Sequence, residues 1–214
     1  MVRNMGMFFP SATARNHWNY SLGFLTMTTP EDVTEEVRVR VPAVDAHVLR
    51  RVYKGFYLDG RLLAQGVQNH LSVGGRWAHR LSDKFSFSLG DDVAYWRGSM
   101  PIQGFDCTAS GWMNYPSISL GLRSRRDLLF TAKAEMLILT NYSFVIEGKA
   151  REYDTDLVSG SAFSLYMEQP FFKKSYITLG FTLAYTDFFW ATWSLFESFD
   201  RNLLYPQITT SLVL

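Results

Sequence analysis

The segment 175–190, SYITLGFTLAYTDFFW, alternates between two kinds of side chain. Large apolar residues from Ile177 to Tyr185 occupy every second position, and the positions between them hold only Thr, Gly and Ala. Successive side chains leave opposite faces of a β-strand, so this pattern predicts a strand. A half-buried strand of a soluble protein carries charged residues on its polar face, whereas this segment carries none. We therefore predict that the apolar face contacts lipid and that the small face packs inside a narrow barrel.

A longer segment, 128–148, supports a membrane barrel by its length. Its even positions from Phe130 to Ile146 are mostly apolar, and its odd positions include Lys133 and Glu135. A tilted strand crosses the hydrocarbon with about 9–11 residues, and strands of soluble proteins usually have about 3–10. This segment is roughly twice as long as a crossing requires. We expect its strand to project beyond the bilayer.

The same alternation predicts further strands at 17–27, 36–41, 66–81, 84–90, 115–122, 159–167 and 204–214. The segment 43–57 has no clean face, and Val44, Val48 and Val52 at spacing four also suit a short helix. A turn at 42–45 between two separate strands gives a count of about ten, and a helix in this region gives eight. Either even number fits a barrel with both ends on one side of the membrane.

The connections between these strands alternate in length along the second half of the chain. Short polar connections are predicted at 81–84, 123–127 and 168–174, and longer ones at 97–111, 149–156 and 191–202. Outer-membrane barrels have short turns on the periplasmic side and longer loops on the outer side. The alternation therefore favours a barrel of that type over a soluble β-sandwich.

Composition excludes several classes. The net charge of +1 gives no indication of a nucleic-acid partner. Apolar runs such as 136–139 are much shorter than the roughly 20 residues of a transmembrane helix. The single Cys107 excludes an internal disulfide framework. The first 15 residues hold only a short apolar stretch, less than a secretory signal has. Either a leader is missing from this chain or the protein is not exported, and we favour the missing leader.

The end of the last segment, 204–214, carries the most specific pattern. Gln207 is followed by the small Thr209 and then by Leu212 and Leu214, two apolar residues two positions apart. The chain resembles the small outer-membrane β-barrel proteins of Gram-negative-type bacteria, whose last strand ends in this order and usually in an aromatic residue. The resemblance is architectural and covers essentially the whole chain. It implies a transmembrane barrel inserted by the barrel-assembly machinery.

One short motif has a chemical alternative. His70 and Ser72 lie two positions apart on one face of the strand 66–81, as in outer-membrane lipid A deacylases, with Asp83 or Asp91 as a carboxylate from the next strand. A serine nucleophile needs an adjacent base and a third group that orients the base. We interpret His70 and Ser72 as polar lumen residues, because geometry and not a dipeptide defines such a site.

Metal and partner sites are weakly indicated. The four histidines show no ligand spacing, so neither a zinc site nor a cofactor is predicted; they are His17, His47, His70 and His79. We interpret the acidic segment 152–156 as a solvated loop in preference to a calcium site. The basic turn at 123–127 is interpreted as an ordinary solvated turn.

Face assignment yields two predicted sets of residues. The charged residues expected inside the lumen are Arg38, Arg40, Arg76, Lys133, Glu135 and Glu147. The residues expected to face lipid are Phe85, Phe87, Leu89, Ile177, Leu179, Phe181 and Leu183. Charges inside a narrow barrel must pair, because an unpaired buried charge is costly. We therefore expect the lumen to be closed by its own side chains.

The sequence thus predicts one all-β domain over 1–214, with an N-terminal extension at 1–15 and a closed, antiparallel, up-and-down transmembrane barrel of about 8–10 strands at 16–214. We expect a non-enzymatic outer-membrane protein with a structural or partner-binding role, in contact with membrane lipid and other envelope proteins. The alternatives are a small-solute pore, a soluble lipocalin-like barrel, and a membrane lipid hydrolase that uses His70 and Ser72.

Overall fold

The computed structural model describes most of the chain as antiparallel strands. The described residues are 18–30, 40–102, 105–124, 128–152, 156–172, 175–188 and 201–214. The strands are β1 (Trp18–Thr28), β2 (Arg40–Tyr53), β3 (Phe56–Ala64), β4 (Gln68–Arg80), β5 (Phe85–Ile102), β6 (Phe105–Arg123), β7 (Leu129–Ile146), β8 (Lys149–Arg151), β9 (Val158–Pro170), β10 (Tyr176–Thr186) and β11 (Leu203–Val213). The predicted extension at 1–15 lies outside the described residues. Within them, no helix is long and apolar enough to cross a membrane.

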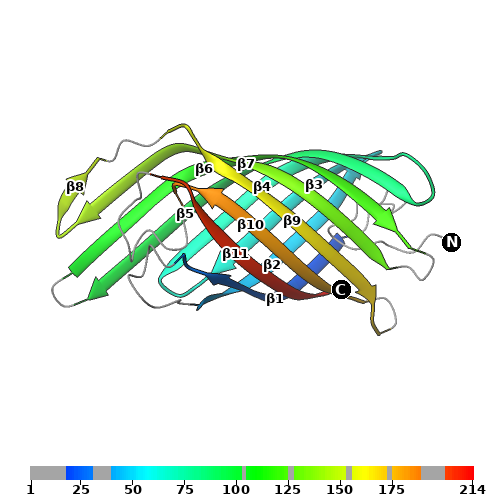
Figure 1. The fold of residues 1–214 in the computed structure, drawn as a ribbon, viewed down its shortest axis with the longest axis horizontal. Coiled ribbons are helices and arrows are strands. Elements are labelled where there is room, and N and C mark those ends of the chain that lie inside the picture. Colours follow the sequence, from blue (N-terminus) through cyan, green and yellow to red (C-terminus); the bar gives the residue numbers. More distant parts are fainter. Residues whose placement is uncertain are drawn as a thin grey trace.

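Ten of these strands close into a barrel (Figure 1). Strands β6 to β1 pair in reverse chain order, β1 pairs with β11, and the series continues through β10 and β9 to β7. The additional pairing of β6 with β7 closes the ring, and the short β8 only extends the β7 hairpin. The predicted closed, antiparallel, up-and-down barrel is confirmed, with ten strands.

The two ends of the barrel differ. The turn end holds the start of β1, the end of β11, the turns at 54–55 and 81–84, and the strand ends at Arg123, Leu129, Pro170 and Tyr176. The opposite, loop end holds the end of β10, the start of β11 and the β7–β8 hairpin. The β5–β6 hairpin and β8 extend beyond the other strands at this loop end, at the left of Figure 1.

The outward face of the barrel is apolar over most of its strands. On β1, Trp18, Leu22 and Phe24 are exposed while Asn19 and Ser21 are buried. On β10, the outward positions from Ile177 to Tyr185 alternate with the buried Thr178, Thr182 and Thr186. An apolar band around a polar interior is the reverse of a soluble barrel, and it suits a strand-built membrane span.

The first part of the chain corrects the predicted division of strands. The proposed turn at 42–45 and the alternative helix at 43–57 are both wrong, because β2 runs unbroken through this region and turns at Lys54–Gly55. Gly55 has φ +77°, which glycine adopts without steric cost. Val41, predicted to face outward, pairs with the buried Met27 and packs on the interior.

The stretch at 97–111, predicted as a loop, is also strand. Strands β5 and β6 pair through Ile102 and Phe105, so this region forms a long hairpin. Its mixture of Gly, Ser, Pro and Met hid the strand pattern in the sequence. The projection beyond the bilayer that was predicted for 128–148 therefore applies to β5 and β6 as well.

A β-bulge in β7 corrects a second prediction. The register with β6 shifts at Trp112 and Met113, so one extra residue, Thr140, enters β7. An extra residue reverses which face each later side chain takes. Phe144, predicted to face lipid with the other even positions, is therefore buried in the interior.

Candidate functional site: the barrel lumen

The interior of the barrel holds a belt of charged side chains at mid-height, which we call the ionic belt. It is built by inward-facing positions of β2, β3, β4, β5 and β7. Its members are Asp45, His47, Asp59, Arg61, Arg76, Asp92, Lys133 and Glu135. Charges of both signs alternate within it, which allows each ion to be compensated by a neighbour.

Asp59 is the centre of one group in the ionic belt. Its Oδ2 accepts a hydrogen bond from Arg76 Nη2 at 2.9 Å, and its Oδ1 contacts His47 Nε2. The side chains of Asp59 and Arg76 are 5% and 9% exposed. A carboxylate and a guanidinium at this depth lower the cost of burying each other, so removing either one leaves an uncompensated charge.

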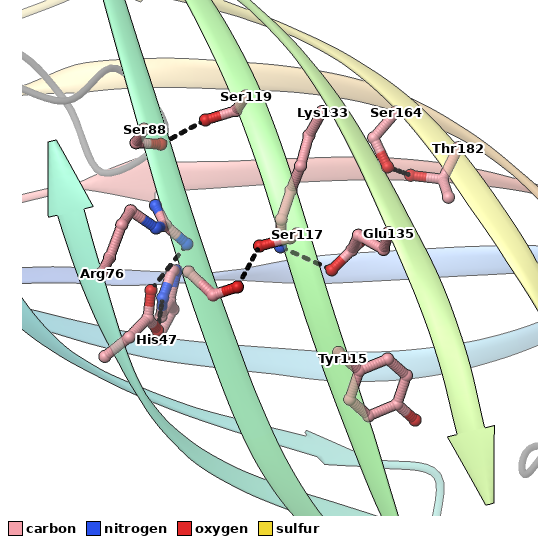
Figure 2. A network of polar contacts seen from close by, with 12 residues as sticks. His47, Arg76, Ser88, Tyr115, Ser117, Ser119, Lys133, Glu135, Ser164 and Thr182 are labelled. Carbon is pink, nitrogen blue, oxygen red and sulfur yellow. Dashed lines mark hydrogen bonds and ion pairs between the residues drawn. The ribbon is translucent and has the colours of Figure 1, made fainter. Parts of the chain in front are cut away.

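Two further pairs complete the ionic belt. The guanidinium of Arg61 donates two hydrogen bonds to Asp45, at 2.9 and 2.7 Å, which is the bidentate geometry that favours arginine. Lys133 Nζ lies 2.5 Å from Glu135 Oε1, and Figure 2 shows the two side chains pointing toward each other. The prediction that these two residues share the inward face of one strand agrees with this geometry.

Hydroxyl groups tie neighbouring strands together around the belt. Ser88 and Ser119 bond between β5 and β6 at 2.5 Å, and Ser164 and Thr182 bond between β9 and β10 at 2.8 Å (Figure 2). Ser117 donates to the carbonyl of Gly90 at 3.3 Å. These five residues therefore satisfy their own hydroxyl groups inside the barrel and leave room for the longer charged side chains.

The ionic belt faces a cavity of about 100 Å³ in the lumen. Its lining includes His70, Ser72 and Tyr115, together with most of the belt residues. The cavity is large enough to hold several water molecules. Ligand pockets usually measure about 300–1,000 Å³, so this one is small for an organic solute.

The geometry at His70 does not match a nucleophile pair. His70 Nε2 bonds to the hydroxyl of Tyr115 at 3.0 Å, and the two rings meet edge to face. Ser72 is buried inside the lumen, away from the lipid-facing surface. Asp83 lies in an exposed turn beside Arg80, and Asp91 lies on the outward face of β5. The two proposed carboxylates therefore do not join His70.

Apolar side chains fill the lumen on the loop side of the ionic belt. Trp96 is fully buried, and its ring centroid lies 5.1 Å from that of Phe188 and 6.1 Å from that of Phe144. This loop-end cluster comprises Leu25, Met27, Ala43, Leu63, Trp96, Cys107, Ala109, Met113, Leu137, Leu139, Phe144, Ala162, Ala184, Phe188, Leu203 and Tyr205. Water gains little from entering a region without polar partners.

A second apolar cluster lies at the turn end. It is formed near the strand ends by Leu49, Tyr57, Ala78, Leu129, Tyr166, Tyr176 and Val213. Gly180 allows the ring of Tyr166 to pack tightly, because a Cβ at that position would lie 2.5 Å from the ring. The ionic belt is thus stacked between two apolar clusters along the barrel axis.

The predicted lumen charges divide into three groups. Arg76, Lys133 and Glu135 lie in the ionic belt. Arg40 and Glu147 do not: Arg40 is exposed where β2 begins, and Glu147 is exposed in the turn between β7 and β8, with φ 50°. The prediction for Glu147 is wrong because the β7 bulge changes the parity of the strand before it. Arg38 lies outside the described residues.

The residues predicted to face lipid all lie on the outward face. Those that are exposed are Phe85, Leu89, Ile177, Leu179 and Phe181, and those that are half-buried are Phe87 and Leu183. The acidic segment 152–156 and the basic turn 123–127 fall largely outside the described residues.

Five members of the ionic belt were not predicted from the sequence: Asp92 on β5, and Asp45, His47, Asp59 and Arg61. The last four lie on β2 and β3, the part of the chain whose strand faces were not clean. A signal was available, since each strand carries two ionisable residues at spacing two on either side of Lys54–Gly55. A hairpin turn at that point brings His47 directly opposite Arg61.

Comparison with known proteins gives distant structural similarities. No family model and no curated protein sequence matches the chain. A deletion mutant of the monoaromatic hydrocarbon channel TodX superposes with a TM-score of 0.42 at 9% identity, over 96% of this chain and 70% of the other. The translocator domain of the autotransporter NalP from Neisseria meningitidis gives 0.46 at 10% identity, over 92% and 86%. The P. putida toluene transporter TodX gives 0.39 at 7%, over 94% and 89%.

The strand pairing and the apolar outward face identify the class of the molecule. Ten antiparallel strands form a closed ring, the outward band is apolar, and the first and last strands pair with their ends on the same side. Closure satisfies the backbone hydrogen bonds of the strands, which a bilayer requires. The chain therefore has the architecture of an outer-membrane β-barrel.

Proposed function

We propose that this outer-membrane barrel does not conduct solutes and that it serves the envelope as a structural or partner-binding protein, alone or as one subunit of a larger outer-membrane assembly. The observation that carries the proposal is the stacking of three layers in the lumen: the loop-end cluster, the ionic belt and the turn-end cluster. Open porins have about 16–18 strands, whereas narrow barrels are filled by their own side chains.

The ionic belt supports the proposal by its pairing. In a conducting pore, charged side chains line a water column and remain hydrated. Here Asp59 contacts both His47 and Arg76, and Arg61 holds Asp45 through two hydrogen bonds. These pairs join neighbouring strands, β2 with β3 and β3 with β4, on one side of the lumen, so each charge is compensated by the barrel itself and not by a water column.

A small-solute pore is the second candidate, and the cavity of about 100 Å³ beside the ionic belt is the observation that favours it. A lipid hydrolase has less support, because Ser72 is buried in the lumen and His70 bonds to Tyr115 instead. We therefore propose that the protein is not an enzyme.

Solute uptake into proteoliposomes tests the proposal against the pore. Vesicles of neutral phosphatidylcholine that contain the folded barrel are loaded with an impermeant dextran and diluted into an isosmotic solution of a small sugar. Light scattering follows the swelling that occurs if the sugar enters. We expect the same rate as in protein-free vesicles, with a diffusion porin as the positive control. Swelling that rises with the amount of barrel and falls with solute size would establish the pore.

A further inference from the structure

The lipid-facing side of β5 carries a carboxylate at its centre. Outward positions on this strand, from the turn end upward, are Phe85, Phe87, Leu89, Asp91, Val93 and Tyr95. Leu89 and Val93 on either side of Asp91 are 45% and 43% exposed, as lipid-facing residues are. Asp91 is itself exposed, so its carboxylate points outward from the middle of the apolar band. Ionisable residues at such a depth are costly and mark functional sites.

The neighbouring strands form a small patch around this carboxylate. Asp91 pairs with Gly75 on β4 and with Pro116 on β6, and Asn114 lies two residues from Pro116 on the same outward face. A Cβ at Gly75 would meet no atom within 4 Å, so the flank of Asp91 is open. Pro116 has no N–H to donate, and it has no paired residue on β7 in the register between β6 and β7. We call these residues the Asp91 patch.

No group of the described chain compensates Asp91. Among the described residues, the ion pairs and side-chain hydrogen bonds leave the Asp91 carboxylate without a partner. The next outward cation on β5 is Arg97, six residues away and thus about 20 Å along the strand. Arg50 lies at the turn end, stacked over Trp18 at 4.7 Å.

The Asp91 carboxylate therefore needs a compensating cation from outside the chain. That cation would have to reach it at the depth of the hydrocarbon core. Lipid amines and divalent cations stay with the headgroups, and residues such as Tyr95 and Trp112, whose rings pack 5.1 Å apart, lie between the patch and the loop end. A symmetric contact with a second copy would place two carboxylates against each other. A Lys or Arg on the membrane-facing surface of another protein has the complementary charge and can reach this depth.

We propose that the Asp91 patch is a lateral docking site for another membrane protein, which presents a Lys or Arg side chain at mid-depth to the Asp91 carboxylate. The inference rests on the proposed partner-binding function and names the wall that the partner contacts, β4 to β6. Gly75 provides the space for the incoming side chain beside Asp91. An arginine suits the site best, because its guanidinium binds a carboxylate through two parallel hydrogen bonds.

Photocrosslinking in the outer membrane of the source bacterium tests the docking site. The residue p-benzoylphenylalanine replaces Val93, beside the Asp91 patch, and in a matched control it replaces Ile208, which is exposed on β11 across the barrel. We expect adducts at position 93 with another membrane protein, whose crosslinked peptide carries a Lys or Arg, and none at position 208. The Asp91→Asn variant keeps the side-chain size and should reduce the adduct at least tenfold.

Adducts with lipid alone, adducts with a second copy, or a yield unchanged by Asp91→Asn would overturn the proposal. A measurement on the purified protein guards against misfolding. In phosphatidylcholine vesicles, Asp91→Leu should raise the denaturant midpoint of the isolated barrel, since it removes a charge from the lipid-facing surface. A lowered midpoint would assign the carboxylate to the barrel itself and overturn the proposal. The vesicle-swelling assay tests the closed lumen separately, so the failure of the docking site and the failure of the closed lumen give different results.

Discussion

The ionic belt predicts a large loss of stability when its central carboxylate is removed. Asp59 contacts two partners and its side chain is 5% exposed, so Asp59→Ala leaves Arg76 buried without its ion-pair partner. Breaking a buried pair by removing one partner typically costs about 3–5 kcal/mol. Asp59→Asn keeps the size and one acceptor oxygen, and we expect a smaller loss of about 1–3 kcal/mol, as for a buried hydrogen bond to a charged group.

Denaturant unfolding in detergent micelles measures this loss. The fluorescence of the buried Trp96 changes as the lumen opens, and at a slope of about 3 kcal/mol per molar urea the expected loss moves the midpoint of Asp59→Ala by about 1–1.7 M. The matched control is Asp83→Ala, which removes a carboxylate from an exposed turn where its side chain is 94% exposed. Exposed pairs contribute little, about 0–1 kcal/mol. Equal midpoints for the two alanine variants would refute the buried pairing.

Three further predictions concern the wall and the lumen. Phe181→Arg should lower the free energy of unfolding by about 2–4 kcal/mol if its strand crosses the bilayer, whereas Gln169→Arg, near the turn end, should lower it by about 0–1 kcal/mol. Equal, small losses for the two variants in lipid vesicles would contradict the membrane span. Gly180→Ala should lower stability by about 1–3 kcal/mol because its Cβ would overlap a tyrosine ring, whereas Gly75→Ala, with open space around the Cβ, should leave stability unchanged. Equal denaturant midpoints for the two variants would contradict this prediction. Purified protein should release no fatty acid from lipid A, and release that disappears in Ser72→Ala would establish the hydrolase.

The alternation of side chains was enough to predict the barrel and its lipid-facing wall. From Ile177 to Thr186, β10 has large apolar residues on one face and small residues on the other, so parity alone assigns each residue. Parity fails where a strand contains an irregularity. The extra Thr140 in β7 has no signature in the sequence, because the bulge depends on the pairing with β6. Because of this bulge, Phe144 faces the lumen, whereas its parity predicts that it faces lipid.

The ionic belt was predictable only in part, for a related reason. Lys133 and Glu135 lie on a clean strand and were assigned inward, and the structure pairs them. Asp45 and Asp59 lie on β2 and β3, where Val, Ala and Arg occupy both faces, so the sequence did not reveal the turn at Lys54–Gly55. Which charge meets which also depends on the register across strands, and a single sequence carries little information about register.

Conductance across a planar lipid bilayer tests the closed lumen most directly. The folded barrel is inserted from detergent, and current is recorded over several salt concentrations and voltages, with a general diffusion porin as the positive control. The stacking of the loop-end cluster, the ionic belt and the turn-end cluster predicts no steady, reproducible current from the unmodified protein. An open-channel current of uniform size, proportional to salt concentration, would contradict the closed lumen and establish a small-solute pore.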